Sequence, residues 1–285
     1  MSVITFVNNL DEETGKTMSL VAIATNMAIE YNNRILIIST TNKEDKIRNC
    51  YFEEKQFLKN RKGIFGGAKQ TLDTENGIEG IAKIARSNKL TPEIITNYTR
   101  VVFKDRLEVI FGTEKKEIYE DLQEKDIVEE YVDLINVAKL YYDKVFVDLD
   151  ENIDENIREQ ILDRSDLVVV NTSQNYSSLK KLKEKKENDE LLKSPRTLIL
   201  VGRYDKYSKY NSKNITRYLE EKNQILTIPY NTLYFEAANE AGVPDLFLSL
   251  RKNIDSEDRN AIFIEEVKRA SENIVYRLQE LQSKM

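Results

Sequence analysis

The chain of 285 residues contains no histidine, no tryptophan and a single cysteine, Cys50. Without histidine there is no imidazole for acid–base catalysis or for metal binding. One cysteine cannot form an internal disulfide or a thiolate cluster, which fits a reducing compartment. We therefore expect a cytoplasmic protein whose chemistry, if it has any, uses neither histidine nor a cluster of thiolates.

Glycine and proline are also scarce, with 9 and 4 residues, so there is little material for long linkers. No stretch approaches the ~20 apolar residues that a membrane span needs, and the first residues lack the pattern of a secretory signal. The composition, 32% charged and 40% hydrophobic, is typical of an ordered soluble protein, and the net charge of −6 argues mildly against nucleic-acid binding. We expect DNA not to be a partner and a membrane to be reached only through partner proteins.

Short apolar runs alternate with helical patterns along most of the chain. Several runs are apolar throughout, as in parallel strands that are covered on both faces. This alternation predicts an α/β fold with a doubly wound, mostly parallel sheet, whose ligands bind at the carboxyl ends of the strands. We expect strands at 4–7, 35–38, 107–111, 145–149, 167–171, 197–201 and 224–228, and helices at 16–31, 43–60, 125–141, 155–163, 177–188, 212–221 and 232–241.

Residues 61–106 are the least regular part, with a glycine-rich loop (Gly63, Gly66, Gly67) before a helix near 78–86. We expect one P-loop α/β domain over residues 1–250 and a helical tail over 251–285. Apolar residues recur in the tail at helical spacing. A helix docked on the domain is favoured over membrane binding or coiled-coil pairing. The apolar positions are Ile262, Val267, Ala270, Ile274, Leu278 and Leu281.

The segment 3–17 is the most informative, because an apolar run, a loop and Gly15-Lys16-Thr17 precede an amphipathic helix. These three residues match the end of the phosphate-binding pattern G-x-x-x-x-G-K-[ST], in which the lysine reaches the phosphates and the hydroxyl holds Mg²⁺. Leu10 stands where the first glycine belongs, and three acids, at positions 11 to 13, fill the interior. The sequence favours a phosphate site over a surface Lys-Thr that merely begins a helix.

Asp148 ends the apolar run 144–148, and a carboxylate at the end of a strand is what a Walker-B metal contact requires. A turn or helix-cap aspartate is the alternative, and the metal role is favoured because a P-loop pattern precedes it. Asp150 either serves the adjoining segment or only caps a helix at 152–158.

The chain resembles the ParA/MinD-type, deviant-Walker P-loop ATPases from about residue 1 to 250. The likeness rests on Gly15-Lys16-Thr17 and on six later segments: 34–38, 142–148, 165–172, 201–205, 228–231 and 236–241. It implies ATP or ADP with Mg²⁺ as cofactor, Gly15, Lys16, Thr17 and Met18 around the nucleotide, and Thr17 with Asp148 at the metal. It also implies Arg203 and Pro229 beside the base, and a homodimer. The stretch 203–211 with the Ile228-Pro-Tyr-Asn231 turn is similar to the TadZ/CpaE branch, whose members position pilus or secretion machinery.

Several departures from that family affect the hydrolytic machinery. Asp11 stands where members carry a signature lysine, and Glu12 and Glu13 replace two glycines. Ser39 and Thr41 stand where members place aspartates, one of them tied to activating the attacking water. Carboxylates near a triphosphate oppose its binding, and hydrolysis depends on donors and on a group that positions water. We therefore expect weak or absent hydrolysis in a degenerate member of the family.

Two further clusters invite a binding role. The lysines at 180, 181, 183, 185 and 186 suggest DNA binding, although a solvated helix face paired with Glu184, Glu187 and Glu190 is favoured. The loop with Tyr204, Tyr207 and Tyr210 is either a partner contact or packing below the sheet edge.

Three functions remain as hypotheses. The first, which we favour, is a positioning or scaffold protein that recruits a component of a secretion, pilus or conjugation system. The second is an active partition ATPase that moves on non-specific DNA. The third is a small-molecule ligase or kinase on the same fold, which the loss of the P-loop glycines and the absence of histidine disfavour.

Overall fold

The computed structural model describes residues 1–9, 13–41, 46–53, 77–85, 90–112, 124–251 and 258–284. Asp11 and Glu12, as well as the loop glycines at 63, 66 and 67, lie outside these ranges. The expectations attached to them therefore stay predictions.

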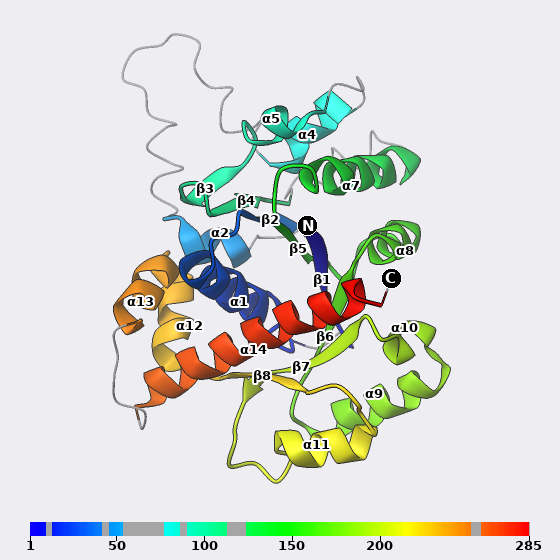
Figure 1. Ribbon diagram of the computed structural model, residues 1–285, viewed down its shortest axis with the longest axis vertical. Coiled ribbons are helices and arrows are strands. Elements are labelled where there is room, and N and C mark those ends of the chain that lie inside the picture. Colours follow the sequence, from blue (N-terminus) through cyan, green and yellow to red (C-terminus); the bar gives the residue numbers. More distant parts are fainter. Residues whose placement is uncertain are drawn as a thin grey trace.

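An eight-stranded sheet forms the centre of the molecule, in the order β3-β4-β2-β5-β1-β6-β7-β8 (Figure 1). All neighbouring pairs are parallel except β3 with β4, which is antiparallel. The predicted doubly wound, mostly parallel sheet is confirmed. The strands are β1 Ser2–Asn8, β2 Ile35–Ser39, β3 Arg100–Phe103, β4 Leu107–Ile110, β5 Lys144–Asp148, β6 Leu167–Thr172, β7 Thr197–Tyr204 and β8 Leu226–Pro229.

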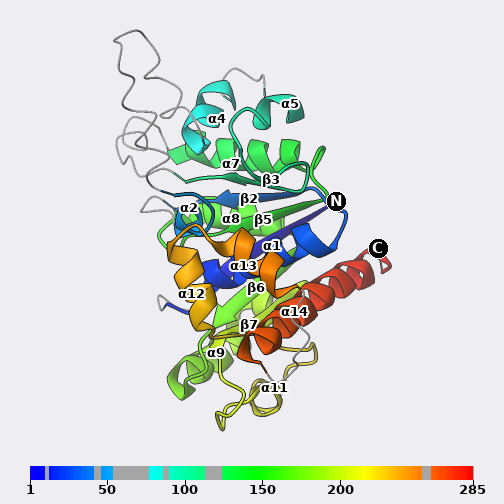
Figure 2. The ribbon, with the colours of Figure 1, turned by 90° about the vertical axis from the view of Figure 1, so that its left-hand side faces the viewer.

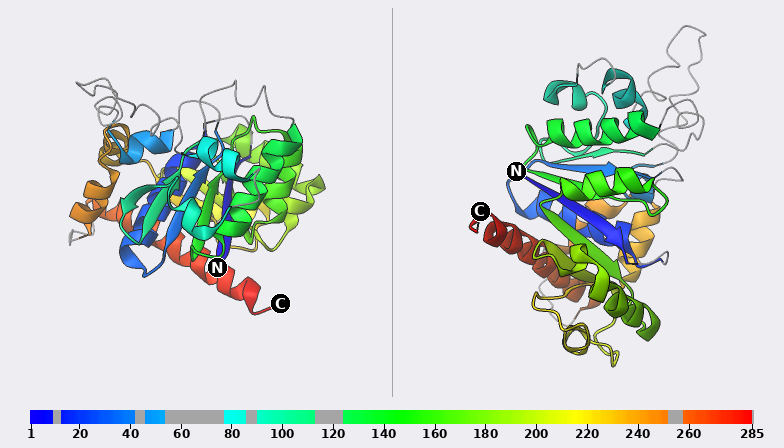
Figure 3. Two further views of the ribbon diagram at one scale, coloured as in Figure 1. Left: turned by 90° about the horizontal axis from the view of Figure 1, so that it is seen from above. Right: turned by 90° about the vertical axis from the view of Figure 1, so that its right-hand side faces the viewer.

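Helices cover both faces of the sheet, as Figures 2 and 3 show. The strands feed two separate cores because successive side chains point to opposite faces: Val3 lies in one core and Ile4 in the other. The helices are α1 Lys16–Glu30, α2 Lys46–Tyr51, α4 Ile78–Ala85, α5 Pro92–Ile95, α7 Glu124–Ala138, α8 Glu155–Asp163, α9 Tyr176–Asn188, α10 Glu190–Lys193, α11 Ser212–Leu219, α12 Thr232–Asn239, α13 Val243–Leu250 and α14 Arg259–Gln282.

The long helix α14 lies against α1 and β8 (Figure 1). Its buried side chains, Phe263, Val267, Ala270, Ile274 and Leu278, belong to the same core as α1. The hydroxyl of Ser271 also accepts a hydrogen bond from the Asn26 side chain of α1, at 3.1 Å. The tail helix thus contributes to the central core, while the division of the chain at residue 250 stays a prediction.

Seven of the eight strands lie where the sequence predicts them, and the differences have local causes. The edge strand β3 was not expected: its apolar run Val101–Phe103 is short, all four of its residues are half-exposed or exposed, and it lies in the least regular part of the sequence. The helix expected at 43–60 ends at Tyr51 in the described part of the chain. The next residue, Phe52, leaves the helix and packs edge-on against Phe111, with ring centroids 5.8 Å apart.

Candidate functional site

Lys16, Thr17 and Asp148 meet where β1 and β5 end and α1 begins. The Lys16 ammonium lies 3.0 Å from Oδ1 of Asp148, and the Thr17 hydroxyl donates to Oδ2 at 2.7 Å. Lys16 and Asp148 are each only 7% exposed. A buried ion pair holds its geometry firmly, because removing one partner leaves a desolvated charge and costs about 3–5 kcal/mol.

A second set of polar contacts surrounds the Lys16 ammonium. It donates to the Leu149 carbonyl and lies 3.9 Å from Oε1 of Glu151. Glu151 accepts from the Asn8 amide, whose own oxygen accepts from the Thr14 hydroxyl. The residues just before α1, the end of β1 and the segment after β5 are thereby joined around one buried cation.

Gly15 gives α1 its special beginning. Its φ of 81° lies in the left-handed region, which a glycine adopts without steric penalty. As the N-cap it offers no side chain, so the first N–H groups of α1 receive no hydrogen bond from it. Such N–H groups, together with the positive end of the helix dipole, suit an anion such as phosphate.

The end of β2 carries hydroxyl groups rather than carboxylates. Thr40 donates to the Asp148 carbonyl at 3.2 Å and accepts from the Asp150 N–H at 2.8 Å. Ser39 is fully buried, and its hydroxyl lies 3.5 Å from the Thr41 N–H. A hydroxyl cannot take a proton from water as a carboxylate does, so residues 39–41 provide no general base.

Asp150 lies beside the end of β2, and its carboxyl is half-buried. Burial alone raises its pKa, but hydrogen bonds from the backbone and side chain of Asn152, a further one from Thr41 and the charge of Lys16 outweigh burial, and the pKa lies below the ordinary value. Asp150 does not cap the following helix, because Asp154 accepts the hydrogen bonds at the beginning of α8. Of the two expected roles, only the one in the adjoining segment fits the structure.

Glu13, the one loop acid that the structure describes, points to solvent and joins two cations. It lies 3.3 Å from Lys46 and 3.4 Å from Arg203. Lys46, and then Arg203, lower the pKa of the Glu13 carboxyl through hydrogen bonds and charge. The Glu13 side chain is 72% exposed, so water screens both pairs.

The end of β7 lies directly against the phosphate-binding loop. A Cβ atom on Gly202 would stand 2.2 Å from the Thr14 carbonyl oxygen, so only glycine permits this approach. The next residue, Arg203, has a left-handed φ of 51°, and its side chain lies beside Gly15. Both residues line an open cavity of about 370 Å³ together with Glu13, Thr14 and Gln174.

The other two expected nucleotide contacts flank this region. Pro229 is the last residue of β8 and pairs with Tyr204 of β7. Tyr204 directly follows Arg203, so Pro229 and Arg203 lie on neighbouring strands. The Met18 carbonyl accepts a hydrogen bond from the Tyr234 hydroxyl at 2.7 Å, which fixes α12 to the first turn of α1. The six residues named for the nucleotide thus come from the ends of β7 and β8 and from the beginning of α1.

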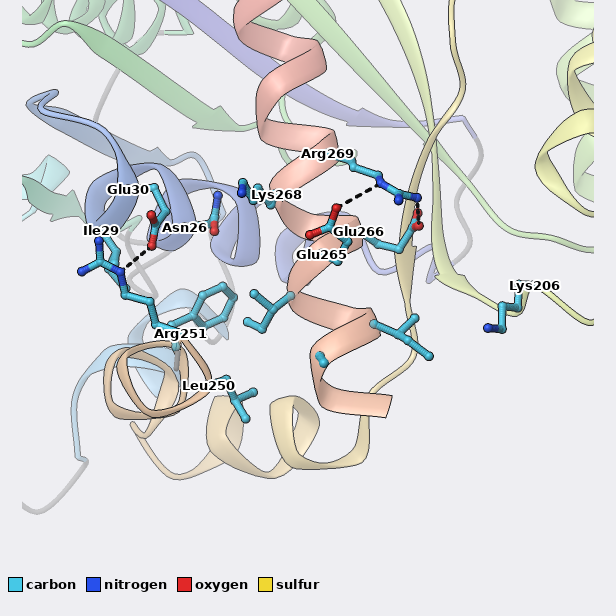
Figure 4. Close-up of a pocket in the computed structure, with 14 residues that line it drawn as sticks. Asn26, Ile29, Glu30, Lys206, Leu250, Arg251, Glu265, Glu266, Lys268 and Arg269 are labelled. Carbon is cyan, nitrogen blue, oxygen red and sulfur yellow. Dashed lines mark hydrogen bonds and ion pairs between the residues drawn. The ribbon is translucent and has the colours of Figure 1, made fainter. Parts of the chain in front are cut away.

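A larger cavity, of about 800 Å³, lies away from the strand ends, between α1, α13 and α14 (Figure 4). Charged groups of both signs line it, and several of them pair with each other. Arg251 lies 2.8 Å from Glu30, and Arg269 lies 2.9 Å from Glu266. None of the residues expected around a nucleotide lines this cavity.

Within the described ranges no cluster of three or more carboxylates or thiols could hold a metal ion. A site with only Thr17 and Asp148 as protein ligands suits Mg²⁺, which usually keeps several waters and binds through one or two carboxylates plus phosphate oxygens. Among the helices that the structure describes, none has the length and apolar character of a membrane span.

Comparison with known proteins identifies the fold. No protein-family model matches the sequence, and no curated protein matches it. Solved structures do match over nearly the whole chain. A ParA family ATPase from Chlorobium tepidum is 16% identical, with 94% of this chain and 97% of that chain covered and a TM-score of 0.65. The chain has the fold of the ParA/MinD P-loop ATPases.

Two further matches show the same fold with bound nucleotide. A plasmid partition protein from Borrelia burgdorferi bound to AMPPNP is 18% identical, with 98% of both chains covered and a TM-score of 0.63. The septum site-determining protein MinD from Pyrococcus horikoshii, complexed with Mg-ADP, is 13% identical over 93% of both chains, with a TM-score of 0.60. At these identities the likeness to ParA/MinD proteins establishes the fold and leaves the site residues as predictions.

Some features of the site could not be expected from the sequence. The contacts of Lys16 with Leu149 and Glu151, and of Glu13 with Arg203, join residues more than 130 positions apart. No local motif marks such pairs. The hydroxyl of Thr40 was also missed, although its position between Ser39 and Thr41 at the end of a strand offered a signal.

Proposed function

We propose that this chain is a ParA/MinD-like positioning or scaffold protein that binds an adenine nucleotide with Mg²⁺ and hydrolyses it slowly or not at all. The observation that carries the proposal is the make-up of the strand ends. The cation, hydroxyl and carboxylate that anchor a nucleotide are in contact, whereas residues 39–41 offer hydroxyl groups in place of a water-activating carboxylate.

The residues fit a Mg²⁺–nucleotide by their chemistry. The uncapped beginning of α1 and the Lys16 ammonium suit the phosphates, Thr17 and Asp148 supply oxygen ligands for Mg²⁺, and Arg203 with Pro229 border the place of the base. When bound, Mg²⁺ neutralises phosphate charge. The chain itself holds the carboxylate of Asp148 between a cation and a hydroxyl.

The departures from the family pattern, at Glu13 and at residues 39–41, are expected to slow hydrolysis while leaving nucleotide binding possible. Glu13 brings a negative charge to the rim of the loop, and its partners Lys46 and Arg203 are engaged by it. Positioned donors and a group that orients water supply most of the rate of phosphoryl transfer. We therefore expect nucleotide to act as a ligand that stabilises one conformation of this protein rather than as a substrate that is hydrolysed.

The partner side of the proposal extends the fold comparison. A MinC:MinD cell division complex from Aquifex aeolicus, 14% identical with a TM-score of 0.58, is one of the matching structures. We propose that this chain likewise works as a homodimer bound to another protein, a component of a secretion, pilus or conjugation system, in the manner of the TadZ/CpaE branch. It would act in the cytoplasm and reach a membrane through that component.

The test is calorimetric titration of the purified chain with ATP and ADP in the presence of Mg²⁺, combined with a measurement of ADP release. We expect binding that Lys16→Ala abolishes, together with ADP release near the background rate. Lys180→Ala, which changes an exposed lysine on α9, serves as the control and should bind as the parent does. No binding to the parent chain, or rapid turnover, contradicts the proposal.

One observation favours a second candidate, an active partition ATPase. Asp150 holds a carboxylate of lowered pKa next to Thr41, at the strand end where the expected aspartates are missing. If the parent chain releases ADP rapidly and Asp150→Asn stops it while leaving nucleotide affinity unchanged, Asp150 is the water-activating group. The second candidate then replaces the first.

A further inference from the structure

Three tyrosines from separate segments form an apolar groove between α9 and α11, two helices that lie side by side in Figure 1. We call it the tyrosine groove. Its volume is about 290 Å³, at the lower end of the ~300–1,000 Å³ of small-molecule sites. Tyr176, Leu179, Lys209, Tyr210, Asn214, Ile215 and Tyr218 line it.

The rings are arranged as a continuous wall above an apolar floor. Tyr176 stacks on Tyr210 with centroids 6.2 Å apart and lies 6.1 Å from the Tyr218 ring. Leu179 and Ile215, each 1% exposed, belong to the core below. Tyr176 itself is 53% exposed. Aromatic rings that gather at the surface over an apolar floor typically mark an interaction site.

The rim of the groove is positively charged. The Lys183 ammonium lies 5.1 Å from the Tyr218 ring centroid, and the Lys209 ammonium 5.0 Å from that of Tyr210. Lys183 already pairs with Glu220 at 3.0 Å, but Lys209 has no ion pair in the described part of the chain. Lys206, above the exposed ring of Tyr207 on the same loop, lines the cavity beside α14 instead.

The loop that carries Tyr210 is held in place. The Gln174 amide donates to the carbonyls of Asp205 and Tyr210, at 2.8 and 2.9 Å, and its oxygen accepts from the Asp205 N–H at 2.9 Å. Asn214 donates to the Lys209 carbonyl at 2.7 Å. The groove is therefore formed before a ligand arrives, which reduces the entropy lost on binding.

We propose that the tyrosine groove binds a proline-rich segment of a partner protein, with acidic residues beside the prolines. Aromatic-lined grooves take up polyproline helices, whose backbone carbonyls are free to accept hydrogen bonds because that helix has none of its own. The tyrosine hydroxyls and the second N–H of the Asn214 amide are donors for those carbonyls, and Lys209 attracts acidic side chains. The partner is the one that the proposed positioning function requires, so this proposal rests on that function.

Nucleic acid fits the same surface less well. Binding along a phosphate backbone needs a track of available cations. Four of the five lysines of α9 are paired instead: Lys180 with Glu184, Lys183 with Glu220, Lys185 with Asp189 and Lys186 with Glu221. The groove is also short and apolar, which suits a peptide more than a nucleotide strand.

The experiment measures fluorescence anisotropy of a labelled peptide that has a run of prolines between two pairs of aspartates, with the full chain as titrant. We expect saturable binding that Tyr176→Ala and Tyr218→Ala weaken about tenfold or more, as for aromatic anchors at interfaces. Lys209→Glu should weaken this peptide too, and should not weaken a peptide with lysine in place of aspartate. Tyr276→Ala, which removes another exposed tyrosine, from α14, is the control and should bind as the parent does.

Two outcomes overturn the proposal: no saturable binding by the parent chain, or binding that Tyr176→Ala leaves unchanged. Tighter binding of a labelled oligo-dT strand than of the acidic peptide also overturns it. Calorimetry with ATP and Mg²⁺ on Tyr176→Ala separates this proposal from the proposed function, because Tyr176 is not among the nucleotide residues. Normal nucleotide binding with lost peptide binding supports the groove, and its thermal unfolding midpoint verifies that the variant is folded.

Discussion

At the scale of single residues, a buried polar cluster lies next to an exposed charged rim. Lys16, Thr17 and Asp148 are held together at 2.7 to 3.0 Å in a buried position. Glu13 and Arg203, on the solvent side, are paired at 3.4 Å in an exposed position. A substitution in the buried set lowers the free energy of unfolding strongly, whereas a substitution in the exposed set changes it little. Substitutions in the rim should therefore alter nucleotide affinity without unfolding the chain.

The Glu13→Gln substitution tests this expectation for the rim by removing a single negative charge. The substitution removes a negative charge near the phosphate site and releases Lys46 and Arg203. We expect ATP to bind about two- to fivefold more tightly, which corresponds to the ~0.5–1 kcal/mol of an exposed charge interaction. Calorimetry at low and high salt measures it, and the gain should shrink as salt screens the charge. Glu184→Gln, an exposed carboxylate on α9, is the control.

The pH dependence of this effect has a definite sign. Because the folded-state pKa of Glu13 lies below its ordinary value, the two ion pairs stabilise the fold above that ordinary value. The contribution is lost as the pH falls through the lowered pKa. Parent and Glu13→Gln should thus differ slightly in thermal stability at neutral pH and converge in acid. An affinity that falls in Glu13→Gln would show instead that the carboxylate supports the nucleotide site.

At the scale of helices and strands, the sequence predicts the interior of the fold better than its edges. Fully apolar runs such as Val145–Val147 identify central strands, because burial on both faces leaves no other composition. The edge strand β3 escapes this pattern, since Val101 is 52% exposed. The helix α13 was also missed: Pro244 in its first turn reads as a loop signal, although proline is well accepted there.

The candidate site shows the same division. Gly15, Lys16, Thr17 and Asp148 are local signals, each tied to the end of a strand or the start of a helix. The approach of Gly202 to Thr14 and the pair of Glu13 with Arg203 depend on two loops that meet only in the folded chain. The tyrosine groove is similar, because Tyr176 comes from α9 while Tyr210 and Tyr218 come from the next crossover. Sequence spacing alone carries no information on such contacts between distant segments.

The helix α14 provides the test at this scale. Ile274 is fully buried in the core that α14 shares with α1. Ile274→Ala should lower the free energy of unfolding by about 2–5 kcal/mol through lost burial and the cavity that remains. Tyr276→Ala, on the exposed side of the same helix, should change it by less than about 0.5 kcal/mol. Urea denaturation followed by circular dichroism measures both.

A single unfolding transition in both variants is part of this expectation, because α14 and the sheet share one core. If Ile274→Ala instead produces an early transition that involves only helix signal, α14 is a detachable element. Its role as part of the central core would then be wrong.

At the scale of the whole molecule, three surfaces of different chemistry lie on one sheet. The strand ends carry the proposed nucleotide site, the α9–α11 side carries the tyrosine groove, and α13 with α14 borders a cavity lined by charges of both signs. Arg203 and Gln174 line the cavity beside the phosphate-binding loop, and Gln174 also holds the loop of the tyrosine groove. The proposed nucleotide site and the tyrosine groove are therefore connected through Gln174.

The charge of the whole molecule separates the two leading functions. A partition ATPase that moves on DNA must bind phosphate backbones non-specifically, and the affinity of such binding falls steeply with salt. This chain has a net charge of −6, and carboxylates pair with four of the five clustered lysines of α9. We expect no ATP-dependent retention on double-stranded DNA at about 100 mM salt. At this salt concentration the release of counterions from DNA still favours the binding of a basic protein. Mobility shift with ATP and Mg²⁺ measures this.

A matched pair of variants makes the result informative. Replacing Glu220 and Glu221 by lysine frees Lys183 and Lys186 and reverses two charges on the same face. That double variant should gain DNA binding that weakens with salt, whereas a variant with both glutamates changed to glutamine should gain less. If the parent chain already binds DNA with ATP as strongly as the lysine variant does, pairing by carboxylates does not silence this face. The chain would then have to be regarded as a DNA-dependent partition ATPase, since ATP-driven retention is the property that a positioning scaffold does not need.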